Sequence, residues 1–125
     1  MKKRIIVLVS SLLLAAMIFA APKDSTYTGE IMDSQCAKNA SHGPMLKKEG
    51  MGDKDPNDAM AKKMCTMNCV KHGGKYVLFD AVKKSVYQLD DQTKPEQFAG
   101  ANVKVSGTLD KATKTIHVMS IEATS

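Results

Sequence analysis

Two segments near the end of the chain alternate apolar and polar residues with a period of two. Residues 102–110 have the sequence NVKVSGTLD, residues 114–123 have the sequence KTIHVMSIEA, and a Lys-Ala-Thr turn separates them. This alternation is typical of paired strands with one buried face. The residues that we predict to face inward are Val103, Val105, Ile116 and Val118. Gly107 predicts a bulge or sharp bend, which a small closed sheet needs.

Three further segments with strand character precede this hairpin. TYTGEIMD at 26–33 predicts a first strand, and KYVLFD at 75–80 and SVYQLD at 85–90 predict a hairpin around an AVKK turn. KPEQFAG at 94–100 is too short for more than one helical turn. We therefore predict a mainly β fold: a small five-stranded antiparallel barrel of the oligonucleotide/oligosaccharide-binding (OB) type, with a loop-helix insertion at 34–75 after the first strand.

The insertion divides into a loop and one helix. Residues 41–58, SHGPMLKKEGMGDKDPND, show no sustained period and are rich in Gly, Pro, Lys and Asp, so we predict a mobile loop. Asp55 followed by proline is a helix-start signal. We predict a helix from Pro56 to His72, ended by the two glycines at 73–74.

The first twenty residues have the organisation of a bacterial secretory signal peptide. Residues 2–4 are basic, residues 5–19 are apolar except for two serines, and small residues follow. The apolar run is shorter than the roughly 18 to 20 residues of a spanning helix, so we expect no stable membrane anchor. We predict cleavage after Ala20, removal of 1–20, and a single OB-like β domain at 21–125 in the periplasm or secreted.

The charge balance gives no support for nucleic-acid binding. The chain has 18 basic and 13 acidic residues, but three of the basic ones lie in the predicted signal peptide. The predicted mature chain therefore has a net charge of only about +2, with no Trp and with Lys and Asp interleaved. A nucleic-acid partner requires a basic stripe with aromatic platforms, so this class is excluded.

Five segments together carry a resemblance to a known family. They are TGEIMDSQC, CTMNCVKHGGKYVLFD, VYQLDDQ, FAGANVKVSGTLD and TIHVMSIE. With them the chain resembles a family of small exported bacterial proteins that is classed as a domain of unknown function. The most specific marks are Asp-Ser-x-Cys and the CxxxC that precedes a glycine and YVL. The resemblance implies export and a compact β domain, and it implies no reaction.

The three cysteines are the strongest candidates for chemistry. At 100° per residue, Cys65, Cys69 and His72 share one face of the predicted helix. Cys36 and His42 follow the first strand, so Cys36, His42, Cys65 and Cys69 would supply three thiolates and one imidazole. This is a closed tetrahedral set for zinc that copper or iron can also use. We therefore predict a module that binds a transition metal. We predict that it is non-enzymatic, because no carboxylate pair, nucleophile-base motif or phosphate loop is present.

Two alternatives explain the cysteines without a metal. In an exported protein Cys36 could form a disulfide with Cys65 or Cys69, which would give a stapled envelope binding module with one free thiol. Cys65 and Cys69 are poorly oriented to pair with each other. A thiol redox protein is the other alternative, although the CxxC mark of that class is absent.

Other residues near this region have more ordinary predicted roles. Met60, Met64 and Met67 form a helical stripe away from the cysteines, which we interpret as core filler rather than as copper ligands. His72 is expected to cap the helix C-terminus, where a cation is favoured. His117 alternates with apolar neighbours and is expected to face solvent. Asp33 and Ser34 are expected either to orient a ligand or to begin the turn after the first strand.

Overall fold

A computed structural model of the chain describes residues 23–124. The strands are β1 (Ser25–Asp33), β2 (Tyr76–Asp80), β3 (Ser85–Leu89), β4 (Asn102–Asp110) and β5 (Thr115–Ala123). The helices are α1 (Ser34–Lys38), α2 (Gly43–Lys48), α3 (Ala59–Lys71) and the 3₁₀ turn η1 (Lys94–Phe98). The predicted signal peptide at 1–20, with residues 21, 22 and 125 of the predicted domain, lies outside the described part. Within that part, no helix is both long enough and apolar enough to cross a membrane.

The five strands form one mixed sheet that closes in a ring in the order β1-β2-β3-β5-β4. The predicted hairpins are confirmed, because β2 pairs with β3 and β4 pairs with β5, both antiparallel. The prediction of a wholly antiparallel sheet is wrong at one pair, since β3 and β5 run parallel where Leu89 lies beside Ile116. The reason is topological, because β4 does not follow β3 as its neighbour but pairs with β1 on the other side of the ring. The β4–β5 hairpin then places β5 between β4 and β3, in the same direction as β3.

Local sequence accounts for the turns and for the bend of the sheet. The carboxylate of Asp80 accepts hydrogen bonds from the backbone N–H groups of Val82 and Lys83, both at 3.0 Å, and so closes the β2–β3 turn. The β4–β5 register shifts between Ser106 and Gly107, which confirms the predicted bulge. A Cβ atom at Gly107 would overlap the carbonyl of His117, so only glycine allows the strands to approach here.

The interior of the ring is one hydrophobic core. Its buried members are Ile31, Tyr76, Leu78, Tyr87, Leu89, Ala99, Val103, Val105 and Ile116. Val103, Val105 and Ile116 are fully buried, as predicted, whereas Val118 is half-buried and packs against the cluster. The alternation of the last two strands therefore gave the correct inward face.

The insertion contains more helix than the sequence predicts. The short helix α2 occupies part of the segment 41–58, which the sequence predicts as a mobile loop, and the short helix α1 lies just before that segment. The main helix begins at Ala59 rather than Pro56, because Asp58 and not Asp55 is its N-cap. The carboxylate of Asp58 accepts a hydrogen bond from the Ala61 N–H at 2.8 Å. The helix ends at Lys71, one residue before the predicted end, and its C-cap His72 is followed by Gly73 in a left-handed conformation (φ 100°).

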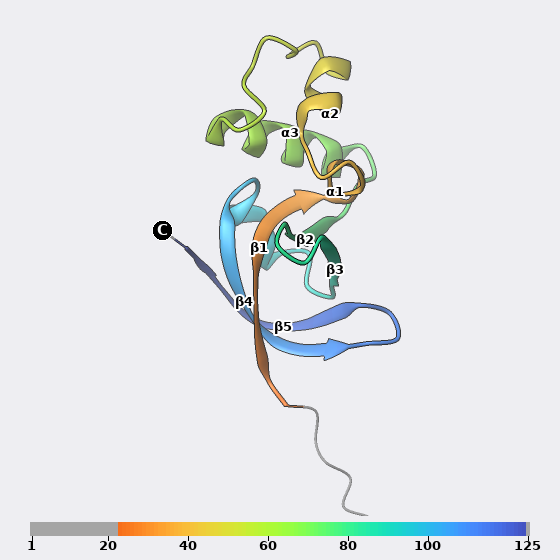
Figure 1. Cartoon of the computed structure of the whole chain (residues 1–125), viewed down its shortest axis with the longest axis vertical. Coiled ribbons are helices and arrows are strands. Elements are labelled where there is room, and N and C mark those ends of the chain that lie inside the picture. Colours follow the sequence, from red (N-terminus) through yellow and green to blue (C-terminus); the bar gives the residue numbers. More distant parts are fainter. Residues whose placement is uncertain (1–22, 125) are drawn as a thin grey trace, which may run out of the picture.

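The helices form a layer over one end of the ring, and the β4–β5 turn lies toward the other end (Figure 1). A second hydrophobic core lies between this layer and β1 and β2. Its buried members are Met32, Cys36, Ala37, Leu46, Ala61, Cys65, Cys69 and Val77. All three cysteines are therefore core residues of the insertion, and they are placed by its packing against the sheet.

Candidate metal centre

Cys36 lies on α1, and the buried side chain of Asp33 fixes the start of that helix. Asp33 is the N-cap, and its carboxylate accepts hydrogen bonds from the backbone N–H groups of Gln35 (2.8 Å) and Cys36 (3.2 Å). The Ser34 N–H donates to the carbonyl of Lys75 at 2.9 Å, which ties the turn to the beginning of β2. Asp33 therefore begins the turn, which was one of its two expected roles. At the same time it positions Cys36.

Cys65 and Cys69 lie on successive turns of α3 and face the sheet. The chain after the C-terminal end of this helix turns back on it, because the Gly74 N–H donates to the Cys69 carbonyl at 2.9 Å. A Cβ atom at Gly74 would come within 2.9 Å of that carbonyl oxygen and 3.3 Å of the Asp33 carboxylate. Glycine at this position therefore lets the Cys69 end of α3 approach α1.

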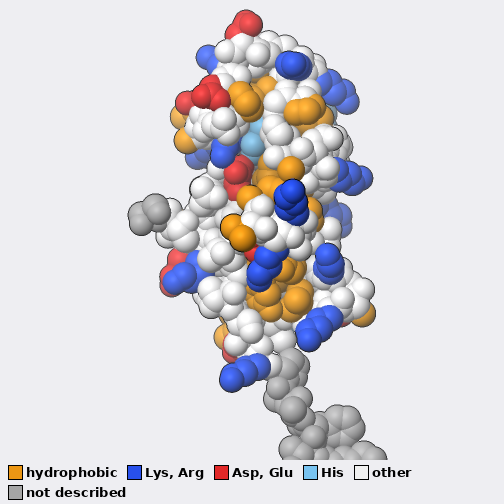
Figure 2. Space-filling model, viewed as in Figure 1, with side chains coloured by type: hydrophobic (Ala, Val, Ile, Leu, Met, Phe, Trp, Pro, Cys, Tyr) orange, Lys and Arg blue, Asp and Glu red, His pale blue; other side chains and the backbone are white. Residues whose placement is uncertain are grey.

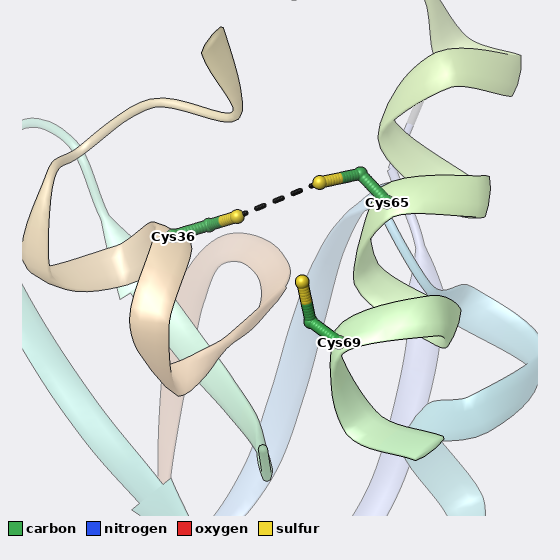
Figure 3. Close-up of side chains that lie close together, drawn as sticks. All are labelled: Cys36, Cys65 and Cys69. Carbon is green, nitrogen blue, oxygen red and sulfur yellow. Dashed lines mark hydrogen bonds between the residues drawn. The ribbon is translucent and has the colours of Figure 1, made fainter. Parts of the chain in front are cut away.

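The three thiols converge on one buried point. Their Sγ atoms all lie within 4.8 Å of one another, and those of Cys36 and Cys65 are 3.7 Å apart. The exposed fractions of Cys36, Cys65 and Cys69 are 0%, 0% and 3%. Figure 3 shows the Cys36 thiol entering from one side and the other two from the facing helix. All three are free thiols, and this arrangement can hold a metal ion.

The surroundings of the thiols favour their protonated form when no metal is bound. Burial raises the pKa of Cys36, and the neighbouring Asp33 carboxylate raises it further. Burial also raises the pKa of Cys65, and it raises the pKa of Cys69 to about 12. Because a metal binds thiolates, an incoming ion must displace protons from these groups.

His42 is buried but does not join the three thiols. Its exposed fraction is 2%, and its Nε2 atom lies 2.5 Å from the Oε1 atom of Glu30. Since a carboxylate only accepts, Nε2 is the donor in this pair. Nδ1 has no hydrogen-bond partner within residues 23–124. The carboxylate of Glu30, for which the sequence carries no functional signal, competes for the imidazole, so His42 as a fourth ligand stays a prediction.

Glu30 and Lys62 complete a charged group beside His42. The Lys62 Nζ donates to Glu30 Oε2 at 3.0 Å. Burial raises the pKa of Glu30, but the hydrogen bonds from His42 and Lys62 outweigh this effect, and its pKa is lowered. The group lines a hollow of about 440 Å³ between the insertion and the ring, with Phe79 and Asn102 among the other walls. Figure 2 shows acidic, basic and histidine side chains meeting on this face of the molecule.

The other two described histidines are not part of the thiol cluster, although the sequence places His72 on the same helical face as Cys65 and Cys69. His72 is the C-cap of α3, and its Nδ1 contacts the Asn68 carbonyl at 2.8 Å. His117 is exposed on β5 and contacts the Asp90 carboxylate at 2.9 Å. Neither is a ligand candidate for the buried point.

The interpretation of the methionine stripe as core filler is wrong for two of its three members. The exposed fractions of Met60 and Met64 are 63% and 49%. Only Met67 is partly buried, and it packs against the core of the ring. The helical spacing of the stripe is as predicted, but the face that a helix buries depends on how the helix docks.

No protein-family model, curated protein or solved structure matches this chain. Membership of the exported family that the chain resembles stays a prediction, and so does export itself. The geometry of the three thiols is therefore the main indication of function.

Proposed function

We propose that this chain is an exported, non-enzymatic metal-binding domain whose ion is held by the thiolates of Cys36, Cys65 and Cys69. The observation that carries the proposal is the mutual approach of the three Sγ atoms within 4.8 Å. A metal–sulfur bond of about 2.3 Å gives a sulfur–sulfur separation of about 3.8 Å in tetrahedral geometry. The Cys36–Cys65 separation of 3.7 Å is close to this value.

The donor set favours a soft ion. Among residues 23–124, the clustered ligand atoms are three sulfurs, and His42 and the carboxylates are not among them. Structural zinc sites almost always have four ligands, whereas thiolates also select Cu(I). We therefore place Cu(I) before the zinc ion that the sequence suggested, and we place iron last. Binding rather than catalysis is supported by the burial and raised pKa of the thiols, which make them poor nucleophiles.

The strand order supports the remaining parts of the proposal. A five-stranded ring in the order β1-β2-β3-β5-β4 is compatible with an OB-like barrel that carries the insertion between β1 and β2. Export rests on the organisation of residues 1–20 alone. N-terminal sequencing of the protein from a bacterial host should give Ala21, and a first residue of Met1 on exported protein would contradict it.

Metal content is the direct test. The purified chain should bind Cu(I) or Zn(II) under anaerobic, reducing conditions, measured by elemental analysis after gel filtration. Cys36→Ser, Cys65→Ser and Cys69→Ser should each reduce metal content and melting temperature, because metal binding energy is linked to folding. Thr66→Val is the matched control, since Thr66 is a buried neighbour of Cys65 whose hydroxyl has no hydrogen-bond partner within the described residues. Full occupancy in all three serine variants would overturn the proposal.

A Cys36–Cys65 disulfide is the second candidate, because these two thiols are a neighbouring pair. It would leave Cys69 as a free thiol in a stapled binding module. Intact mass after alkylation separates the two candidates. A disulfide leaves one alkylated cysteine in the denatured, unreduced protein, whereas the metal-binding form, once the metal is removed, gives three.

A further inference from the structure

The exposed methionines of α3 have no structural explanation in the packing. Six of the nine methionines lie between Met32 and Met67. Met60 and Met64 are among only four large hydrophobic residues that are exposed within residues 23–124. Exposing such side chains forgoes the free energy of burial.

Three methionines line one hollow on this surface. Met64 and Met67 come from successive turns of α3, and Met51 comes from the segment after α2. The hollow measures about 410 Å³, and its other walls are Asn68 and Lys71. The Asn68 amide donates to the Glu49 carboxylate at 2.6 Å, which engages that amide outside the hollow. Among the residues that line the hollow, the three methionines are therefore the ones that carry a soft donor atom.

We propose that Met51, Met64 and Met67 form a second, surface site that binds a soft monovalent ion, Cu(I) or Ag(I). Thioethers are neutral and soft, so they select Cu(I) over the harder divalent ions. They also carry no proton at physiological pH. An ion can bind to them without the proton release that the buried thiols require.

The position of the site suggests that it is where the ion is taken up. Met51 packs against the core that contains the cysteines, and Met64 immediately precedes Cys65. Passage of the ion from thioethers to thiolates rests on the proposed function. It would exchange sulfur ligands, release the thiol protons to solvent and leave the oxidation state of the metal unchanged. The thioether site itself requires no such passage.

The test follows each methionine separately in the full chain. Protein labelled with ¹³C at the methionine methyl groups is titrated with Ag(I), which binds like Cu(I) and is inert to oxidation. Ag(I) also binds thiolates, so the methyl resonances and not the total stoichiometry are the readout. The methyls of Met51, Met64 and Met67 should shift together, whereas Met119, which is 60% exposed on β5, should not. Zn(II) should shift none of them.

Conservative variants provide the second arm. Met51→Leu, Met64→Leu and Met67→Leu keep the apolar volume and should each weaken Ag(I) binding at the two remaining thioethers at least tenfold, while Met119→Leu should have no effect. The proposal fails if the three methyls do not shift, or if Met119 shifts at the same Ag(I) concentration. Metal loss from the cysteine variants is measured separately, by elemental analysis. Methyl shifts that persist in Cys65→Ser would uphold the thioether site even if the thiol centre proved wrong.

Discussion

The Cys36 thiol lies 3.7 Å from the Cys65 thiol, across the junction between α1 and α3. The two residues are 29 positions apart in the chain. Each lies on a helix whose first turn is capped by an aspartate, Asp33 for α1 and Asp58 for α3. The contact therefore depends on two local helix starts and on the docking of both helices against the same end of the sheet.

Replacing His42 by alanine should separate its structural role from a ligand role. We expect His42→Ala to keep full metal content, because the imidazole pairs with Glu30 and not with the thiols. It should lower stability by about 2 to 4 kcal/mol, since the Glu30 carboxylate loses a buried partner. Elemental analysis and denaturant unfolding measure the two effects. Metal loss equal to that of Cys36→Ser would restore His42 as a ligand.

The metal-free protein should lose stability at alkaline pH. The folded-state pKa values of the thiols are raised above about 9, so their contribution to stability is present below pH 9 and is lost as the pH rises through the folded values. The expected loss is up to about 1.4 kcal/mol per pH unit for each such thiol. Urea unfolding at pH 7 and pH 10 measures it. Burial also raises the pKa of Tyr76, so the relevant quantity is the difference between wild type and Cys69→Ser.

The metal-bound protein should lack this alkaline loss, because its thiolates are already deprotonated. Identical pH dependence in wild type and Cys69→Ser would show that the Cys69 thiol is not perturbed by folding.

Gly100 should be a critical contact between the ring and the helical layer. It has φ 74°, and a Cβ atom there would lie 2.6 Å from the Lys63 backbone nitrogen. Gly100→Ala should therefore cost several kcal/mol through both strain and displacement of α3. Gly50→Ala is a matched control, because Gly50 has the same φ but open space around it. The melting temperatures of both variants are compared with that of the wild type. An equal loss of stability in the two variants would mean that α3 does not contact Gly100 closely.

A charge inside the ring should destabilise the fold severely. Val105 is fully buried in the sheet core, so Val105→Asp buries an unpaired carboxylate at a cost of several kcal/mol. Val82 is 94% exposed in the β2–β3 turn, and Val82→Asp should change stability by less than about 0.5 kcal/mol. Circular dichroism melting curves test both. A melting temperature unchanged by Val105→Asp would show that the strand register is wrong.

The start of α3 can be tested with two aspartates. Asp58→Ala removes the cap of the Ala61 N–H and should cost about 1 kcal/mol. Asp55 is the helix start that the sequence suggested, but its carboxylate accepts a hydrogen bond from the exposed Asn57 N–H. Asp55→Ala should therefore lower the free energy of unfolding by less than Asp58→Ala. Urea unfolding of both variants decides between them, and the reverse order would place the helix start at Asp55.

The candidate site shows where local sequence is informative. Cys65 and Cys69 were placed on one helical face, because four residues of an α-helix make about one turn whatever surrounds it. The place of Asp33 at the end of a strand indicated its turn-starting role as one of two alternatives, whereas its capping of α1 was not predicted. Glu30 gave no such signal, because a single glutamate in a strand indicates nothing until Lys62 and His42 are brought to it from 32 and 12 positions away.

The sequence by itself determined the five strands, the two hairpins, the bulge at Gly107 and the glycine-terminated helix. These features depend on side-chain alternation and on backbone preferences within a few residues. Tertiary structure alone decided the parallel β3–β5 pair, the two short helices α1 and α2, the exposure of Met60 and Met64, and the partner of His42. Each of these depends on which segments meet across the fold, and the free energy of those contacts is absent from any local stretch of sequence.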